Sequence, residues 1–239
     1  MTDLFYTDQF KPDFSQFILS AEESHHIMRV LRKKTGDNIE LTDGKGHRIH
    51  GRIGNQQERQ LVVEVEAYDK QPFPVENRIE IAISIIRPNR MDWAVEKLVE
   101  LGVEKITPLT WHYTNYKNLK ADHLKKIIIN AMKQSHQYYI PEIKQVITGE
   151  EWLKQTKEKT GLKLIAHPGT DFMTSPSRYS ARTGNIHIAI GPEGGFDETE
   201  LQLARNSNFY AIALSQTVLR TETAAIAAVS QLKLLYRKL

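Results

Sequence analysis

The sequence predicts a parallel α/β domain that follows a small β-barrel domain, and two patterns carry this prediction. Over the first 70 residues, short alternating runs of apolar and polar residues are separated by glycines, as in antiparallel strands. From residue 79 onward, apolar strand-like runs alternate with helical patterns, which is typical of a parallel sheet covered by helices. Pro72 and Pro74 disfavour helix in the residues before them, so we place the domain boundary between residues 1–72 and residues 73–239.

The first domain is expected to contain three main strands and one short helix. The segment 20–23 resembles a helix start signal, and Ile27, Val30 and Leu31 share one face of a helix over residues 24–31. The strands are expected over residues 37–42, 47–53 and 60–67.

The second domain is expected to alternate strands and helices. Gly102 stops its first helix, and Asp197 with Glu200 forms a capping box at the start of another. We expect strands over residues 79–86, 103–109, 162–167, 186–190 and 209–214. We expect helices over residues 90–101, 122–138, 197–206 and 222–236.

Composition excludes several classes of chemistry. The chain has 239 residues and no cysteine, so it has no thiolate nucleophile and no cysteine-bound metal cluster. Its formal net charge of +3 gives only slight support for a polyanionic partner. No window is an uncharged apolar span, and residues 1–4 lack a signal-peptide pattern, so we expect a soluble cytoplasmic protein.

Two segments predict a ligand site, residues 190–196 and residues 219–224. Each follows an apolar run and precedes a helical pattern, and glycines lack the Cβ that would keep backbone from a ligand. The alternative is a tight turn after a strand. The first segment matches neither the dinucleotide-binding nor the phosphate-loop pattern. A phosphate would also meet Glu193, so a cationic or neutral polar ligand fits better.

Arg220 is the least ordinary residue of the second segment. Thr221 as N-cap and Glu222 near the positive end of the helix dipole are explained by a helix start alone. A helix start alone does not explain a cation just before the positive end of the dipole. A functional role is therefore favoured for Arg220. His167 and Pro168 end a neighbouring strand, so their loop is expected beside the other two.

Further charged residues have two interpretations, phosphate contact or ordinary solvation. Basic side chains cluster in the first domain at His25, His26, Arg29, Arg32, Lys33 and Lys34. Arg87 and Arg90 lie at the end of a predicted strand, where α/β sheets bind ligands. The two adjacent histidines do not share a helix face, so no metal site is expected. Met91, Trp93 and Leu98 are expected in the core or a subunit contact.

The chain resembles the RsmE family of 16S rRNA uracil-N3 methyltransferases, in the SPOUT superfamily. The most specific matching segments are residues 190–196 and 219–224. The resemblance also covers residues 26–32, 97–103, 106–109, 134–135 and 141–143, so it extends along nearly the whole chain.

This resemblance implies a PUA-like barrel, a C-terminal domain with a trefoil knot, and a homodimer acting on 16S rRNA, with the assembled small ribosomal subunit as the expected substrate. It implies S-adenosylmethionine bound by loops 164–168, 190–195 and 214–224. The cofactor residues are then Leu164, His167, Pro168, Ile190, Gly191, Pro192, Gly194, Gly195, Leu214, Leu219 and Thr221. Two alternatives remain: a SPOUT methyltransferase for another RNA such as tRNA, and a non-catalytic ribosome-associated RNA-binding protein.

The implied chemistry is direct methyl transfer to a ring nitrogen. Attack at a pyrimidine carbon normally needs a covalent cysteine adduct, and the chain has no cysteine. Arg220 is the candidate to stabilise the deprotonated uracil, with Glu193 or Glu222 as the base. The chain departs from the family pattern at Lys133, where relatives commonly have an acid, and at Gln137, where they have an arginine. Leu4 replaces a further arginine that is common near the N-terminus.

Overall fold

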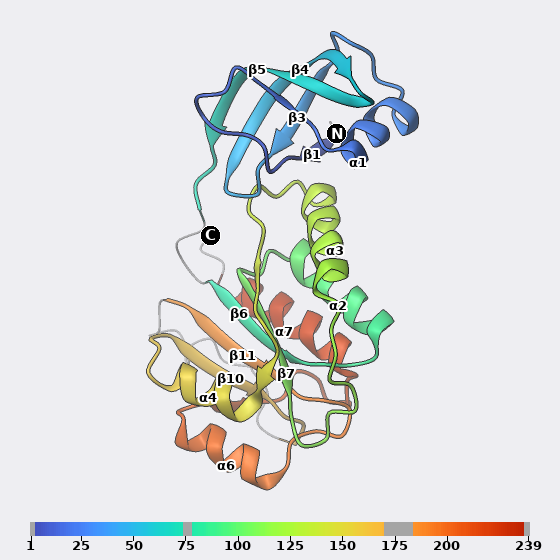
Figure 1. Ribbon diagram of the computed structural model, residues 1–239. Coiled ribbons are helices and arrows are strands. Elements are labelled where there is room, and N and C mark those ends of the chain that lie inside the picture. The colour runs from blue at the N-terminus through green and yellow to red at the C-terminus, as the bar shows by residue number, and fades with distance from the viewer. Residues whose placement is uncertain (1–2, 74–77, 170–183, 237–239) are drawn as a thin grey trace. The chain divides into compact units, whose positions relative to one another are not determined.

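The computed structural model describes residues 3–73, 78–169 and 184–236 (Figure 1). The chain forms two compact units. The first consists of Met1–Phe73 together with Ile129–Ile140, and the second of Pro74–Ile128 together with Pro141–Leu239. Neither unit is one continuous segment, because residues 129–140 belong with the N-terminal part of the chain.

The first unit is built on a mixed five-stranded sheet with the order β1-β3-β4-β5-β2. The first strand is parallel to β3 and the remaining neighbours are antiparallel. The three predicted strands are present, and two short strands, β1 and β2, are additional. The bounds are β1 (Leu4–Tyr6), β2 (Gln16–Ile18), β3 (Asn38–Thr42), β4 (His47–Gln57) and β5 (Gln60–Lys70).

The helical segment of this unit differs from the prediction in its start and in its winding. Helix α1 (Ala21–His25) begins after Ser20, whose hydroxyl accepts a hydrogen bond from the Glu23 amide at 3.2 Å. A π-helical turn, η1 (His26–Val30), follows. Its wider winding rotates the later side chains out of α-helical phase. The predicted shared face is therefore wrong for Val30, whose side chain is 63% exposed.

The second unit contains a parallel sheet with the order β12-β10-β11-β6-β7-β8, and β9 also pairs with β7. The predicted strands are present within a few residues, whereas β8 and β9 were not predicted. The bounds are β6 (Ile79–Ser84), β7 (Lys105–Thr110), β8 (Glu142–Ile143), β9 (Ile147–Thr148), β10 (Leu162–Ala166), β11 (Ile186–Ile190) and β12 (Tyr210–Ile212).

Helices cover both faces of this sheet (Figure 1). On one side α2 (Pro88–Glu100) packs against α7 (Thr221–Leu235), and on the other α4 (Gly149–Lys157) packs against α6 (Glu198–Asn206). The sequence did not predict α4. The predicted capping box of α6 is confirmed, as is Gly102 just beyond α2 with a φ of +69°. No helix within the described ranges is long and apolar enough to cross a membrane.

Helix α3 (Ala121–Gln134) links the two units in sequence and ends four residues earlier than predicted. It ends in a Schellman motif, in which the His136 amide donates to the Lys133 carbonyl at 3.1 Å and the Gln137 amide to the Met132 carbonyl at 3.0 Å. Residue 136 therefore has a left-handed backbone, with a φ of +53°. The predicted helix ends here because this conformation cannot continue an α-helix.

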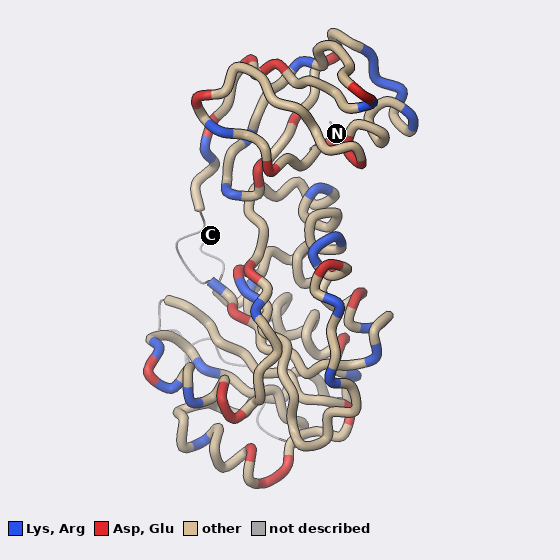
Figure 2. Tube along the Cα trace, in the orientation of Figure 1, with Lys and Arg blue, Asp and Glu red and all other residues tan. Residues whose placement is uncertain are grey.

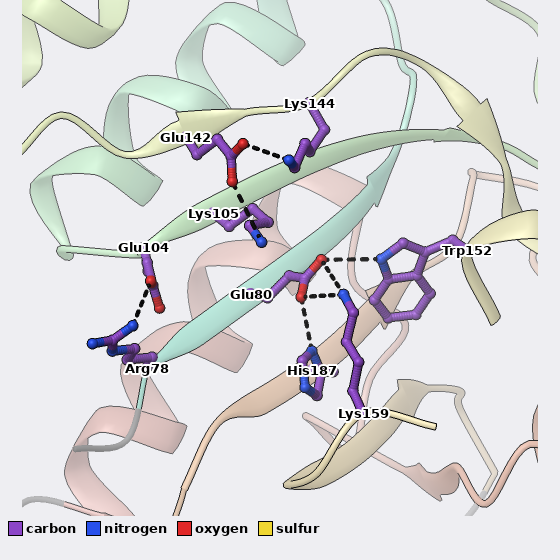
Figure 3. A network of polar contacts seen from close by, with 9 residues as sticks. All are labelled: Arg78, Glu80, Glu104, Lys105, Glu142, Lys144, Trp152, Lys159 and His187. Atoms are coloured by element: carbon purple, nitrogen blue, oxygen red, sulfur yellow. Dashed lines mark hydrogen bonds and ion pairs between the residues drawn. The ribbon is translucent and has the colours of Figure 1, made fainter. Parts of the chain in front are cut away.

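A buried polar network connects the sheet of the second unit to α4 (Figure 3). Glu80 on β6 accepts hydrogen bonds from His187 on β11 at 2.9 Å, from Lys159 at 3.0 Å and from the Trp152 indole at 3.4 Å. Burial alone would raise the pKa of Glu80, but the hydrogen bonds from His187 and Lys159 outweigh it and lower the pKa to about 2.

The lowered pKa of Glu80 predicts acid sensitivity. The carboxylate contributes stability that is fully present above pH 4.5 and is lost as the pH falls toward 2. A shift of this size corresponds to about 3 kcal/mol. We expect Glu80→Gln to lower the free energy of unfolding by about 3 kcal/mol at pH 7 and to flatten its dependence on pH below 4.5, as measured by urea denaturation.

Glu104→Gln is the matched control. Glu104 pairs with Arg78 at 3.1 Å in the same unit, but both side chains are 32% exposed. Its loss should change stability by less than about 1 kcal/mol. Equal effects of the two substitutions would contradict a special role for the buried network.

Candidate active site

Three loops meet at the carboxyl ends of neighbouring strands. The strands β12, β10 and β11 are adjacent and parallel, so the loops that follow them emerge at one edge of the sheet. These loops enclose a cavity of about 310 Å³. Its lining residues are Ala166, His167, Pro168, Ile190, Gly191, Pro192, Glu193, Gly194, Gly195, Phe196, Leu214, Ser215, Thr217, Val218, Leu219, Thr221 and Ala224.

The loop after β11 is held in shape by glycines and by one aromatic ring. A Cβ on Gly191 would lie 2.9 Å from the ring of Phe196, so a side chain there would displace the ring or the loop. Gly195 has a φ of +76° and donates to the Pro192 carbonyl at 2.9 Å, which closes a tight turn. The Phe196 ring packs edge-on against Trp111 at 4.8 Å between centroids.

Two side chains of α7 form hydrogen bonds with the backbone of these loops. The Thr221 hydroxyl donates to the Gly191 carbonyl at 2.9 Å, and the Gln231 amide donates to the Leu214 carbonyl at 2.9 Å. The prediction of Thr221 as N-cap is therefore wrong: Arg220 occupies that position without a side-chain cap hydrogen bond. Thr221 is the first helical residue, and its hydroxyl stabilises the neighbouring loop instead.

Three charged residues form a group beside the cavity. Arg90, in the first turn of α2, places its guanidinium 3.6 Å from Oε1 of Glu222 and 3.9 Å from Oε1 of Glu193. Glu222 is buried, and its Oε2 atom has no hydrogen-bond partner among the described residues. Glu193 is about one-third exposed and lines the cavity. Arg90 thus links a buried carboxylate to an accessible one.

The cavity gathers nearly all the residues predicted to bind a cofactor. Leu164 is the exception, since it is fully buried within β10. Of the three predicted catalytic residues, Glu193 lines the cavity, whereas Arg220 and Glu222 lie next to lining residues in sequence without lining it. Further lining residues lie in the predicted segments but were not predicted individually: Ala166, Phe196, Ser215, Thr217, Val218 and Ala224.

The residues predicted to contact RNA are divided between the units. His25, His26, Arg29, Arg32 and Lys34 are exposed in the first unit, where Figure 2 shows basic residues gathered after α1. Lys33 is half-buried, with its ammonium 3.5 Å from the Asn38 carbonyl oxygen. In the second unit Arg87 is exposed. Met91 and Leu98 are core residues, whereas Trp93 is 45% exposed and is not.

The chemistry of the cavity favours a flat ligand that carries positive charge. Its wall is formed largely by loop backbone and by apolar side chains such as Ile190, Leu214 and Leu219. Glu193 supplies a carboxylate, and no lysine or arginine occurs among the described lining residues. Such a wall suits an aromatic ring with a cationic group and disfavours a phosphate. No cluster of metal-ligating side chains occurs in the described part of the chain.

Comparisons with known proteins identify related families for both parts of the chain. A family model described as an RNA methyltransferase domain matches residues 72–233. A model described as an RNA methyltransferase PUA domain matches residues 19–66. Ribosomal RNA small subunit methyltransferase E of Rickettsia conorii is 31% identical over 221 residues, covering 91% of this chain and 89% of the relative. The Buchnera aphidicola protein of that name is 31% identical over 224 residues, covering 90% and 89%.

Solved structures share the whole fold. A putative methyltransferase from Legionella pneumophila in complex with the cofactor SAM has a TM-score of 0.86 at 30% identity and covers 98% of both chains. Ribosomal RNA small subunit methyltransferase E from Neisseria gonorrhoeae, bound to S-adenosyl methionine, has a TM-score of 0.87 at 28% identity, covering 99% of this chain and 98% of that one. These similarities confirm the predicted fold class, an α/β domain of the SPOUT type that follows a PUA-like N-terminal domain.

The link between α7 and the loop after β11 predicts the effect of Thr221→Val. The substitution keeps the shape of the side chain but leaves the Gly191 carbonyl without its hydroxyl donor. We expect the free energy of unfolding to fall by about 1–3 kcal/mol, as measured by chemical denaturation. Thr223→Val, at an exposed position on the same helix, should be nearly neutral. If both variants lose equal stability, the hydroxyl link is unimportant.

Proposed function

This chain belongs to the RNA methyltransferase family, and we propose that it transfers a methyl group from S-adenosylmethionine to N3 of one uridine in 16S rRNA of the small ribosomal subunit. One observation carries the proposal. The cavity formed by loops after β10, β11 and β12 is lined by the two segments, residues 190–196 and 219–224, that give the chain its resemblance to the uracil-N3 methyltransferases.

The cavity fits S-adenosylmethionine by its chemistry. When bound, this cofactor supplies an electrophilic methyl group on a positively charged sulfur. Ile190, Leu214 and Leu219 offer an apolar surface for the adenine, and exposed loop backbone offers hydrogen bonds to its edge. The carboxylate of Glu193 complements the cationic part of the ligand.

The acceptor requires only positioning and removal of one proton. A ring nitrogen attacks directly once it is deprotonated, so no enzyme nucleophile is needed, in agreement with the absence of cysteine. The uracil passes its N3 proton to a carboxylate, and the new nitrogen–carbon bond forms as the methyl–sulfur bond breaks. Alignment and electrostatic stabilisation then account for most of the rate enhancement.

Arg220 and the two glutamates are assigned to this step. Arg220 is exposed, so its guanidinium is available to stabilise negative charge on the uracil. Glu193 and Glu222 are the candidate bases. Arg90, which contacts both carboxylates, orients them and is a positioning residue in this proposal.

The proposal extends to the assembly of the protein. Trp93 on α2 and Leu234 on α7 expose large apolar surface, 45% and 76% respectively, on two helices that pack together. This surface supports a homodimer, which the family resemblance implies. A cytoplasmic location follows from a ribosomal substrate. The implied trefoil knot depends on the path between β10 and β11, and residues 170–183 of that path lie outside the described residues.

The direct test is methyl transfer from labelled S-adenosylmethionine to small ribosomal subunits from cells that lack the endogenous activity. Nuclease digestion and mass spectrometry then identify the product. We expect 3-methyluridine at a single site in the 16S rRNA. Cofactor binding without incorporation would redirect the search to tRNA. Absence of both would contradict the proposed activity and favour a non-catalytic RNA-binding protein.

Replacement of Arg220 tests the electrostatic assignment. We expect Arg220→Ala to lower kcat by about 10²–10³, because charge on the uracil is no longer stabilised. The melting temperature should hardly change, since the side chain is exposed. Arg205→Ala, which removes another exposed arginine from the same unit, should retain activity. Near-normal turnover of the Arg220 variant would refute the role.

Two further variants identify the base. Glu193→Gln and Glu222→Gln each remove a proton acceptor while nearly preserving shape. The variant that lacks the true base should have its kcat lowered by about 10²–10⁴. Its pH–rate profile should also lose the rise in rate with increasing pH. The other variant should keep that profile and change mainly KM or cofactor affinity. If both profiles stay unchanged, neither carboxylate is the base.

A further inference from the structure

A second cavity, which we call the His136 cavity, lies entirely within the first unit. It has a volume of about 600 Å³ and is formed by β1, the α1–η1 segment and the end of α3. Its lining residues are Asp3, Leu4, Phe5, Glu22, Glu23, His25, His26, Val30, Asn130, Lys133, Gln134 and His136. None of them takes part in the methyl-transfer site described above.

Glu23 gives this cavity a buried acceptor that lacks a donor. Its Oε1 atom pairs with the Lys133 ammonium at 2.5 Å, and the two side chains are 8% and 15% exposed. The Oε2 atom is buried and has no hydrogen-bond partner among the described residues. Buried polar atoms are normally satisfied, so a bound group that donates a hydrogen bond is the natural complement.

Histidine rings add surfaces on which a base can stack. His25 and His26 are exposed, and the His26 ring meets the buried Phe5 ring edge-on, with centroids 6.2 Å apart. Phe5 thereby supports the orientation of this imidazole. Proteins that recognise unpaired RNA commonly stack bases on histidine and other aromatic side chains.

His136 occupies a left-handed backbone position, which few residue types besides glycine adopt readily, histidine among them. Helices α2 and α6 end in the same Schellman geometry as α3, with left-handed residues Gly102 and Asn208 at φ of +69° and +63°. Glycine and asparagine are the residues that tolerate this conformation best. At the end of α3 the position is histidine, at φ +53°, and its side chain lines the cavity. Glycine would satisfy the backbone here but would leave the cavity without this side chain.

The charge of the cavity argues for a base rather than a phosphate inside it. Asp3, Glu22 and Glu23 oppose a single lysine, Lys133, among the described lining residues. Basic residues instead gather in the chain that follows α1 (Figure 2). Among them, the side chains of Arg29, Arg32 and Lys34 are exposed. A nucleotide fits this division, with its base against the carboxylate and its phosphates on the arginines and lysine.

We propose that the His136 cavity binds one unpaired nucleotide of the RNA, and that its base carries an exocyclic amino group. Oε2 of Glu23 accepts a hydrogen bond from this amino group, as carboxylates do from cytosine N4. The histidines stack on or contact the base. The inference rests on the proposed function, because it assumes an RNA substrate, and it adds a contact that selects sequence or structure away from the methylated uridine.

The amino-group contact is tested with two RNA octamers of uridines that carry one central guanosine or one central inosine. Inosine lacks only the amino group. At fixed salt, fluorescence anisotropy should show about 5-fold or tighter binding of the guanosine octamer. The preference should vanish in the double variant Glu23→Leu with Lys133→Met, which removes the carboxylate without leaving a buried charge. No preference in the wild type, or no binding of either octamer, would overturn the proposal.

The matched pair His136→Gly and Asn208→Gly separates binding from stability. Both relieve a left-handed residue at a helix end, so both should have an equal or higher Tm than the wild type. Only His136→Gly removes a side chain from the cavity, and it should weaken binding of the guanosine octamer about 10-fold. Equal affinity of the two variants would overturn the role of His136.

Cofactor binding and methyl transfer distinguish this inference from the proposed function. For His136→Gly we expect unchanged cofactor affinity by calorimetry and a raised KM for small ribosomal subunits. A wild-type protein that binds the octamers with the expected preference but methylates no RNA would leave the cavity assignment intact and refute the proposed reaction. Normal methylation by a wild-type protein that shows no octamer preference would support the proposed reaction and refute the cavity assignment.

Discussion

The adjacency of three parallel strands is the constraint on which the candidate active site depends. Because β10 pairs with β12 on one side and β11 on the other, loops separated by tens of residues emerge at one sheet edge. The cavity is then maintained by backbone links, above all the Thr221 hydroxyl on the Gly191 carbonyl. A loop site held in this way can present its own amides and carbonyls to a ligand, since its conformation does not depend on the ligand.

The two ends of the sheet in the second unit differ in how completely their buried carboxylates are paired. At the amino end, Glu80 is surrounded by His187, Lys159 and Trp152, so its charge is fully compensated. At the carboxyl end, Glu222 is buried with only a 3.6 Å contact to Arg90 and one oxygen without a partner. The first arrangement stabilises the fold. The second places a buried carboxylate with one unpartnered oxygen where a cationic cofactor and a general base are proposed.

The sequence was informative where local chemistry decides the structure. The capping residues Ser20 and Asp197 and the stop at Gly102 act through neighbouring backbone atoms, so their patterns were sufficient. Val30 was wrongly assigned to a buried face because a π-helical turn has no clear sequence signal. The cofactor loops were recognised through motifs, whereas the contacts of Arg90 with Glu193 and Glu222 depend on tertiary structure that no spacing reveals.

The departures from the family pattern acquire a physical meaning in the first unit. Lys133, found where relatives commonly have an acid, neutralises one oxygen of the buried Glu23. An acid at this position would face Glu23 as a like charge, at a cost that burial would increase. In this chain Lys133 and Glu23 form an ion pair, and both residues line the His136 cavity. Because the Lys133–Glu23 pair lies in the first unit and the cofactor loops lie in the other, we assign the pair a role in RNA selection rather than in catalysis.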